Sequence, residues 1–228
     1  MRLDPEKKEI KELRSLIDLR NKEILEIGCG DGRITAMLKR KDNNILAIEP
    51  DKEQLKLARK KVSGVKFQVG TMSNLKTKKK FDLVIFSMSF HHVPVRSKKT
   101  VIKKAFSLLN QNGQILLIEP AIDGQVCEVV MTLVPAERKR IEAANKVIKE
   151  LKILKKKSIE LNWCYDDFES LSGFYEEMFC RKLTRGELDK IKKIVQVNSC
   201  PKEIILKDKI NYFLIKDQDG KRNSNGIF

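Results

Sequence analysis

The sequence lacks any long apolar run, and this absence excludes a membrane-spanning helix. Its longest apolar stretches, such as residues 83–86 and 115–118, have the length of a strand, whereas a membrane helix needs about 20 apolar residues. Residues 1–6 are polar and acidic where a signal peptide would carry an apolar stretch, so we expect no export signal. The expectation is a soluble cytoplasmic protein with no membrane partner.

Paired cysteines are missing as well. The five cysteines are odd in number and include no C-x-x-C pair, which argues against a disulfide framework and against a structural zinc site. The two histidines have no cysteine or carboxylate nearby at the spacing of metal ligands, so we expect no bound metal. A reducing compartment fits this cysteine usage best.

Negative charge is scarce. Asp and Glu number 31 against 47 for Lys and Arg, which gives a net charge of +16 and raises RNA or another polyanion as a partner. Most of the positive side chains are lysines spread along the chain, whereas base recognition and bidentate phosphate contacts favour arginine. A hydrated lysine-rich surface therefore explains the charge without a polyanion, and RNA remains the alternative.

The first half of the chain alternates short apolar runs with helical periodicity. Helices are expected after the capping residues Asp4, Asp51 and Ser97. Strands separated by helices predict an α/β fold, with a parallel sheet covered on both faces. The predicted strands are residues 24–27, 45–48, 65–69, 82–86 and 114–118.

The second half changes to a helical pattern from residue 121 to about residue 200. A basic amphipathic helix is expected around Ile141, Ala144 and Ile148. Residues 166–169 and 184–187 have the spacing of capping boxes, which predicts two further helix starts. The segment is rich in aromatic side chains, most of which we expect in a core and one or two in a substrate pocket: Trp163, Tyr165, Phe168, Phe174, Tyr175 and Phe179.

Two apolar runs close the sequence, at residues 203–206 and 210–215. They flank Asp208-Lys209 and predict an antiparallel hairpin. A chain of 228 residues with 41% apolar side chains can bury one sizeable core. We therefore predict a single domain, whose core is formed by residues 1–120 and 201–228 and whose cap is the helical segment 121–200.

A glycine-rich turn lies directly between the first predicted strand and its helix. Residues 26–33 read Glu26-Ile27-Gly28-Cys29-Gly30-Asp31-Gly32-Arg33, and such a turn lets the backbone approach a nucleotide closely. The G-x-G-x-x-G pattern of dinucleotide enzymes would need its third glycine at Arg33, so the spacing disfavours NAD.

The acidic residue followed by x-G-x-G-x-G resembles the first motif of class I S-adenosylmethionine-dependent methyltransferases. Glu26 and the three glycines match that motif, with Cys29 inside it. The resemblance implies a doubly wound, mostly parallel, Rossmann-like sheet of seven strands. It also implies that Glu26 and the turn hold S-adenosylmethionine, whose product is S-adenosylhomocysteine.

Two further motifs are expected around the adenosine part of the cofactor. Glu49 ends the second predicted strand about 20 residues after the turn, where a carboxylate accepts both ribose hydroxyls. By resemblance, Pro50 lines the adenine face. The third motif usually carries an acidic residue, and this chain has Thr71-Met72 there instead, so Thr71 is expected to accept a hydrogen bond and Met72 to pack on the ring. A place in the core is the alternative for Met72.

The fourth motif, residues 81–94, resembles the corresponding segment of small-molecule members of the family, including the quinone-type methyltransferases. The resemblance implies that the backbone near Ser87 holds the methionine end of the cofactor. His91 and His92, the only histidines, follow it, and a histidine can take the proton from a methyl acceptor. We expect one of the two to face the pocket. A purely structural role for both is the alternative.

The acceptor class is left with three alternatives. A small organic molecule is favoured, with RNA or a protein side chain behind it, and a non-catalytic cofactor-binding protein is a further hypothesis. The Asn-Pro-Pro-Tyr and Pro-Cys motifs of amino-group and cytosine methyltransferases are absent after the fourth strand. Their absence disfavours those nucleic acid and protein substrates.

Overall fold

The computed structural model describes residues 1–195, 199–200 and 203–216. Contacts between Cα atoms group the chain into two compact units. Unit 1 comprises Met1–Ser15, Pro120–Glu142 and Ser158–Asn211, and unit 2 comprises Leu16–Glu119, Ala143–Lys157 and Tyr212–Phe228. In the part of the chain that the structure describes, no helix has the length and hydropathy to cross a membrane.

The predicted α/β class is confirmed. The strands are β1 Arg2–Leu3, β2 Glu23–Ile27, β3 Asn44–Glu49, β4 Lys66–Val69, β5 Phe81–Ser87, β6 Leu109–Pro120, β7 Ile153–Tyr165, β8 Ser199–Cys200 and β9 Glu203–Lys216. The helices are α1 Lys8–Leu16, α2 Arg33–Leu38, α3 Lys52–Lys61, α4 Lys98–Ser107, α5 Gln125–Leu133, α6 Ala136–Ile148, α7 Phe168–Met178 and α8 Arg185–Val195, with a 3₁₀ turn at Val95–Ser97.

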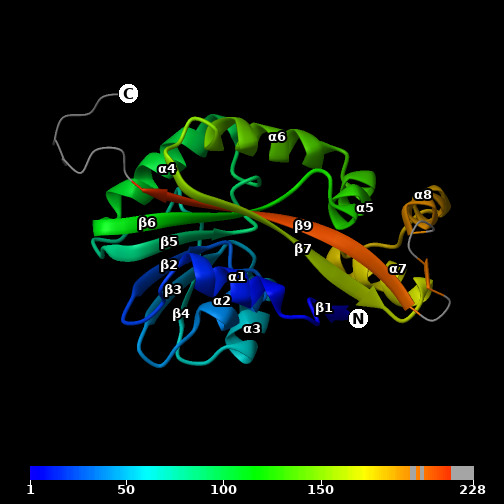
Figure 1. Cartoon of the computed structure of the whole chain (residues 1–228), viewed down its shortest axis with the longest axis horizontal. Helices are drawn as coiled ribbons and strands as arrows, with labels where there is room; N and C mark the ends of the chain where they lie inside the picture. Colours follow the sequence, from blue (N-terminus) through cyan, green and yellow to red (C-terminus); the bar gives the residue numbers. More distant parts are fainter. Residues whose placement is uncertain (196–198, 201–202, 217–228) are drawn as a thin grey trace. The chain divides into compact units, whose positions relative to one another are not determined.

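The strands follow the order β1-β7-β9-β6-β5-β2-β3-β4, and β8 pairs with β9, so more strands form than the seven predicted. In unit 2, β2 pairs in parallel with β3 and β5, β3 with β4, and β5 with β6. Figure 1 shows β2 to β6 side by side, coloured from blue to green. The chain moves outward from β2 through β3 to β4 and then returns to β5 on the other side. The carboxyl ends of β2 and β5 therefore flank the point where ligands bind in doubly wound sheets.

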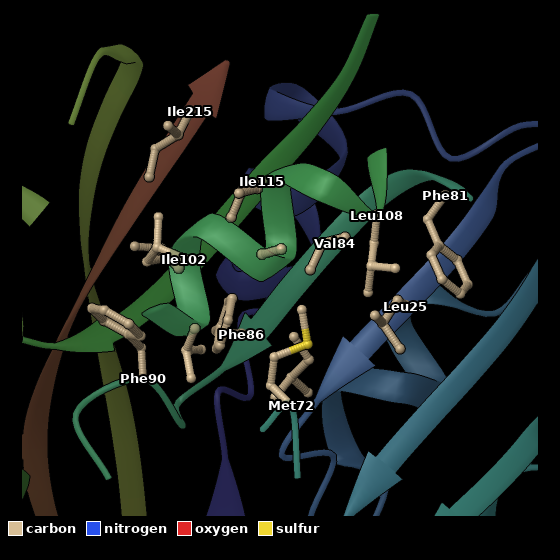
Figure 2. Packing of buried hydrophobic residues seen from close by; sticks show 14 of the residues in the cluster. Leu25, Met72, Phe81, Val84, Phe86, Phe90, Ile102, Leu108, Ile115 and Ile215 are labelled. Carbon is tan, nitrogen blue, oxygen red and sulfur yellow. The ribbon is translucent and has the colours of Figure 1, made fainter. Parts of the chain in front are cut away.

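Apolar side chains on both faces of the parallel strands explain why this sheet is buried. The side chains of Leu25, Val84 and Phe86 are 0% exposed and lie in one cluster with Met72 and Phe81 (Figure 2). Strands that are covered on both faces need continuous apolar runs, which is the pattern of residues 45–48 and 83–86.

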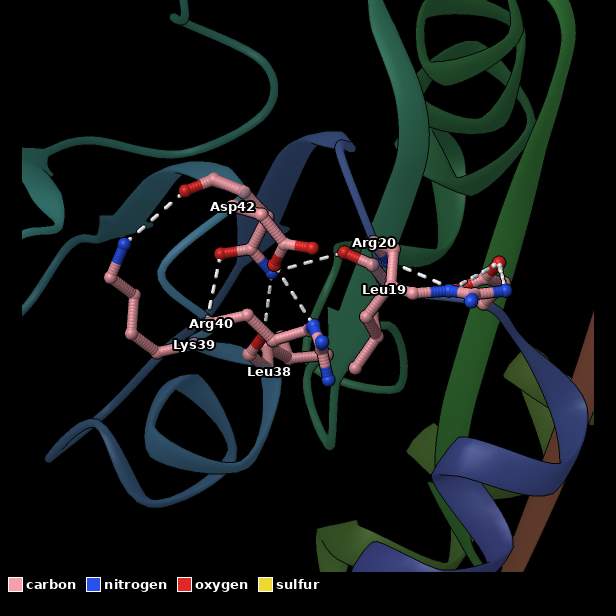
Figure 3. A network of polar contacts seen from close by, with 8 residues as sticks. Leu19, Arg20, Leu38, Lys39, Arg40 and Asp42 are labelled. Atoms are coloured by element: carbon pink, nitrogen blue, oxygen red, sulfur yellow. Dashed lines mark hydrogen bonds and ion pairs between the residues drawn. The ribbon is translucent and has the colours of Figure 1, made fainter.

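A polar contact closes the connection between α2 and β3. The buried Asn43 amide donates to the carbonyl oxygens of Leu38 (2.7 Å) and Leu19 (3.4 Å), and its own oxygen accepts from the Arg40 amide (3.0 Å) (Figure 3). The Leu38 carbonyl and the Arg40 amide, which lie at and after the end of α2, are thereby hydrogen-bonded without water. The contact fixes where β3 begins, and hence where Glu49 ends it.

Two predictions of secondary structure, for β7 and for β9, are wrong. Segment 121–200 is not helical throughout, because β7 occupies Ile153–Tyr165. Residues 154–158 are exposed in succession, and Leu161, Cys164 and Tyr165 are buried, so burial does not alternate along this strand. The helical stripe ends at Ile148, and we extended it too far.

The predicted hairpin at Asp208-Lys209 is also wrong, because β9 runs unbroken through both residues. Leu206, Asp208 and Ile210 are 0%, 2% and 1% exposed, so the aspartate occupies an inward position of a regular strand. An Asp-Lys pair favours a turn locally, and the pairing of a long strand overrides that preference.

Helix caps follow the sequence in most cases. Asp51 accepts hydrogen bonds from the amides of Glu53 and Gln54, as predicted, whereas Ser97 makes no such bond at the start of α4. The capping box of α7 lies one residue later than predicted. Asp167 accepts from the Ser170 amide (2.7 Å), and the Ser170 hydroxyl accepts from the Asp167 amide (3.1 Å).

Replacing Asp167 with Ala should lower the free energy of unfolding by about 1 kcal/mol, because the first turn of α7 loses its side-chain acceptor. The neighbouring Asp166→Ala is the matched control, since Asp166 is exposed and lies outside the box; a change within about 0.5 kcal/mol is expected. Urea unfolding of the two variants measures the difference. Equal losses would show that the box stabilises nothing.

Candidate functional site

The glycine turn between β2 and α2 has left-handed backbone at all three glycines. The φ angles of Gly28, Gly30 and Gly32 are 72°, 53° and 83°, a region that side chains disfavour. A Cβ on Gly28 would overlap the Ser89 side chain, and one on Gly32 would lie 3.1 Å from Ala58. A Cβ on Gly30 would meet nothing within 4 Å. Packing therefore requires two of the glycines, and the third leaves backbone exposed to open space.

Glu49 lies against this turn. One of its carboxylate oxygens accepts from the Gly30 amide (3.0 Å), and the other accepts from the Asp51 amide (3.0 Å). The Gly28 and Cys29 amides donate to the Ile48 carbonyl at 2.8 and 3.2 Å, so the turn is fixed to the end of β3. The two predicted motifs are brought together, and Pro50 follows them as an exposed residue.

Glu26 is fully buried at the carboxyl end of β2. Its two oxygens accept from the hydroxyls of Thr35 (2.6 Å) and Ser87 (2.8 Å). Burial raises the pKa of Glu26 to about 7, and the two hydroxyls and Arg33 offset only part of that effect. Burial likewise raises the pKa of the neighbouring Cys29 thiol, so this cysteine stays protonated.

The residues of the third motif divide between surface and core. Thr71 is exposed, and its amide donates to the Asn74 side chain (2.8 Å). Met72 is 2% exposed and belongs to the apolar cluster of unit 2, as Figure 2 shows. These contacts describe a core methionine. A role for Thr71 or Met72 at an adenine ring stays a prediction.

The segment after β5 turns back on the glycine loop. The Ser89 hydroxyl donates to the Ile27 carbonyl at 2.5 Å, and Met88, with a φ of 52°, donates its amide to Ile118 (2.9 Å). The chain makes tight turns here, because the amides of His92 and Val93 donate back to the carbonyl oxygens of Ser89 and Phe90.

The two histidines differ in environment. His91 is 4% exposed, and its Nδ1 lies 2.8 Å from an oxygen of Glu119, which is also buried. His92 is exposed, with its ring centroid 4.0 Å from that of His91. The proton-accepting role assigned to these residues stays a prediction.

The sequence analysis did not predict three residues that contact the predicted site residues Glu26 and His91: Thr35, Lys98 and Glu119. Glu119 is the next-to-last residue of β6, and Glu49 is the last residue of β3; this position near the end of a strand was the signal available for Glu119. Lys98 is a cation in the first turn of α4, where the helix dipole disfavours positive charge, so its position also called for a reason.

The raised pKa of Glu26 predicts a pH-dependent stability. Because the folded-state pKa lies above the ordinary value of 4.5, its contribution is fully present below pH 4.5 and is lost as pH rises through about 7. The rise of the pKa from 4.5 to about 7 corresponds to about 3 kcal/mol in the free energy of unfolding, at about 1.4 kcal/mol per pKa unit. Glu26→Gln should remove this loss, and urea unfolding at pH 5 and pH 8 measures it. An identical pH dependence in both proteins would show that Glu26 is ionised when folded.

A family model described as a methyltransferase domain matches residues 24–113. The chain is 29% identical over 126 residues to an uncharacterized methyltransferase of Alkaliphilus oremlandii, covering 55% of this chain and 53% of the relative. It is 28% identical over 113 residues to one of Staphylococcus carnosus, covering 50% and 54%. The matches thus span about half the length of these curated relatives.

Solved structures show the same fold. A protein of Bacillus halodurans C-125 named as a candidate methyltransferase has a TM-score of 0.62 at 16% identity, covering 90% of this chain and 96% of its own. The YcgJ protein of Bacillus subtilis has a TM-score of 0.56 at 18% identity, covering 91% and 98%. With the glycine turn and the parallel strands in place, the chain has the Rossmann-like fold of these solved structures, and its residues 24–113 are similar to a methyltransferase domain.

Proposed function

We propose that the chain is an S-adenosylmethionine-dependent methyltransferase. The observation that carries the proposal is the contact between Glu49 and the Gly30 amide, beside backbone that faces open space. Each oxygen of the Glu49 carboxylate accepts one backbone amide, and a carboxylate has about four acceptor sites. Glu49 therefore keeps acceptor capacity for two ribose hydroxyls.

The other predicted residues fit the remaining parts of the cofactor. Gly30 permits close approach of the backbone, and Pro50 presents an exposed apolar ring next to Glu49. Ser87 is 6% exposed and gives its hydroxyl to Glu26, so its backbone rather than its side chain would hold the methionine end. When bound, S-adenosylmethionine supplies a methyl group on a positively charged sulfur.

A small organic molecule is the acceptor class that we propose first. Such an acceptor would lose a proton as its oxygen or nitrogen gains the methyl group, and a histidine can take that proton. His91 and His92 lie directly after β5, at the carboxyl edge that also carries Glu26 and Glu49. Proximity and orientation provide much of the rate in transfers of this kind, so the histidine adds to a reaction that binding already favours.

Calorimetric titration with S-adenosylhomocysteine tests the cofactor directly. We expect saturable binding, and none with NAD. Gly30→Val should abolish it, because the side chain fills the space beside the backbone. Gly64→Val is the matched control: Gly64 also has a left-handed φ of 69°, but a Cβ there meets only Lys39. Absence of binding by the folded, ligand-free protein would favour a non-catalytic scaffold. Normal binding by Gly30→Val would show that the cofactor does not bind beside Gly30.

RNA is the second candidate, and a concentration of lysines favours it. Residues 143–157 contain six exposed lysines and one acidic residue, Glu150, which pairs with Lys99 of α4 (2.6 Å). Across the ranges that the structure describes, none of these six lysines forms an ion pair with an acidic side chain: Lys146, Lys149, Lys152, Lys155, Lys156 and Lys157. This basic surface, residues 146–157, offers phosphate contacts without an aromatic side chain for base stacking.

The salt dependence of RNA binding separates the two acceptor classes. For a small-molecule enzyme we expect weak binding without preference among RNAs, measured by fluorescence anisotropy at about 50 and 200 mM salt. Exchanging Lys152, Lys155 and Lys157 for Gln should reduce this background. The same exchange at the exposed Lys41, Lys52 and Lys60 is the control. Tight, RNA-selective binding that falls steeply with salt and depends on the first three lysines would make RNA the acceptor.

A further inference from the structure

A hollow of about 520 Å³ lies at the outer edge of the sheet in unit 2. Its walls come from the first residues of β3, from residues at and before the start of β4, and from the loop at 75–79 that leads to β5. Figure 1 shows β4 as the outermost of these strands. Glu49 ends β3 about 16 Å from its first residue, since the six residues of this strand rise about 3.3 Å each. The hollow therefore lies at the opposite end of β3 from the proposed cofactor site.

The charged side chains of this hollow are positive. Among the described residues that line it are three lysines and no Asp or Glu. Lys79 is paired with Glu23, and its ammonium lies 5.9 Å from the centre of the Phe81 ring. Lys66 and Lys76 are exposed, and within the described part of the chain neither forms an ion pair. Two unpaired ammonium groups, one from β4 and one from the loop, thus favour an anion in this hollow.

The loop that forms one wall is fixed from outside the hollow. Lys104 of α4 donates to the carbonyl oxygens of Ser73 (3.0 Å) and Leu75 (2.7 Å). Lys80 donates to the Ser107 carbonyl at the end of the same helix. The loop is therefore held in place before any ligand arrives, so binding requires little ordering of the chain.

The rest of the lining favours an organic ligand over a bare ion. Leu46 and Leu75 are 8% and 4% exposed and belong to the apolar cluster of unit 2, so they give the hollow an apolar floor. Asn44 and Gln68 add amide groups, and the Asn44 nitrogen donates to Glu23 (2.8 Å), which leaves its oxygen as an acceptor. Apolar surface with a few polar groups is the usual lining of small-molecule sites, whose volumes are about 300–1,000 Å³.

We propose that this hollow binds a small organic phosphate monoester, with the phosphate at Lys66 and Lys76 and the organic part over Leu46 and Leu75. A phosphate monoester carries about −1.5 to −2 charges at neutral pH, which matches two unpaired ammonium groups. The two amides supply donors and acceptors for a heterocyclic ring, so a nucleoside monophosphate has the required chemistry. The proposal does not depend on the methyltransferase function, because the glycine turn lies at the other end of β3.

Calorimetric titration with uridine monophosphate tests the site. We expect saturable binding that is unchanged by excess S-adenosylhomocysteine, and weaker binding of inorganic phosphate, which cannot cover the apolar floor. Lys66→Gln/Lys76→Gln should weaken uridine monophosphate binding at least about tenfold, because two charge-assisted contacts are lost. Lys60→Gln/Lys78→Gln is the matched control: both lysines are exposed, neither lines the hollow, and the same charge is removed. Its affinity should stay within about twofold of the wild type.

Absence of saturable binding, or equal losses in the two double variants, would overturn the proposal. Displacement of the nucleotide by S-adenosylhomocysteine would do so too, because it would place the nucleotide at the glycine turn. Equal affinity for inorganic phosphate would make this an ion site and not an ester site. A single-stranded oligouridylate distinguishes the free ester from RNA: binding of the oligomer without binding of uridine monophosphate would make the hollow an RNA contact and overturn the proposal. The exchanged lysines are all exposed, so we expect both variants to fold, which circular dichroism checks.

Discussion

Parallel pairing of β2 with its two neighbours is the constraint on which the rest of the structure depends. The register that pairs Ile27 with Ile48 and with Phe86 brings the carboxyl ends of three strands to one edge. Glu49 and Ser87 are the next residues on those neighbours, so the glycine turn leaves β2 between them. A shift of one residue in either pairing would turn these side chains to the other face of the sheet.

Glu26, Glu49 and Glu119 lie at or next to the last residues of β2, β3 and β6. They differ in the groups that donate hydrogen bonds to them. Glu26 is bound by two hydroxyls, Glu49 by two backbone amides, and Glu119 by two amides and an imidazole. Hydroxyls offset little of the cost of burying a charge, which is why the pKa of Glu26 rises to about 7. One residue type therefore occupies three different hydrogen-bonding environments at one edge of the sheet.

Local sequence patterns predicted the part of the fold whose stability is local. The apolar strands, the glycine turn and Glu49 follow from residues close in the chain, and the structure places them as expected. The predictions for β7 and for the unbroken β9 were wrong because the pairing of long strands overrode local preferences for a helix in segment 121–200 and for a turn at Asp208. The contact between Glu119 and His91 was missed because it joins residues 28 apart; only the position of Glu119 near the end of a strand pointed to that residue.

The close approach of Ser89 to Gly28 has a consequence for how such a site can change. Any Cβ at residue 28 would overlap Ser89, so a larger side chain at position 89 would press on the glycine turn. Position 89 is therefore closed to diversification, although it lies among residues that follow β5. His92 and Val95 are exposed, the latter by 68%, and can vary without disturbing that turn. Substitutions are thus expected to be tolerated at the outer positions of the segment, while the inner ones stay fixed.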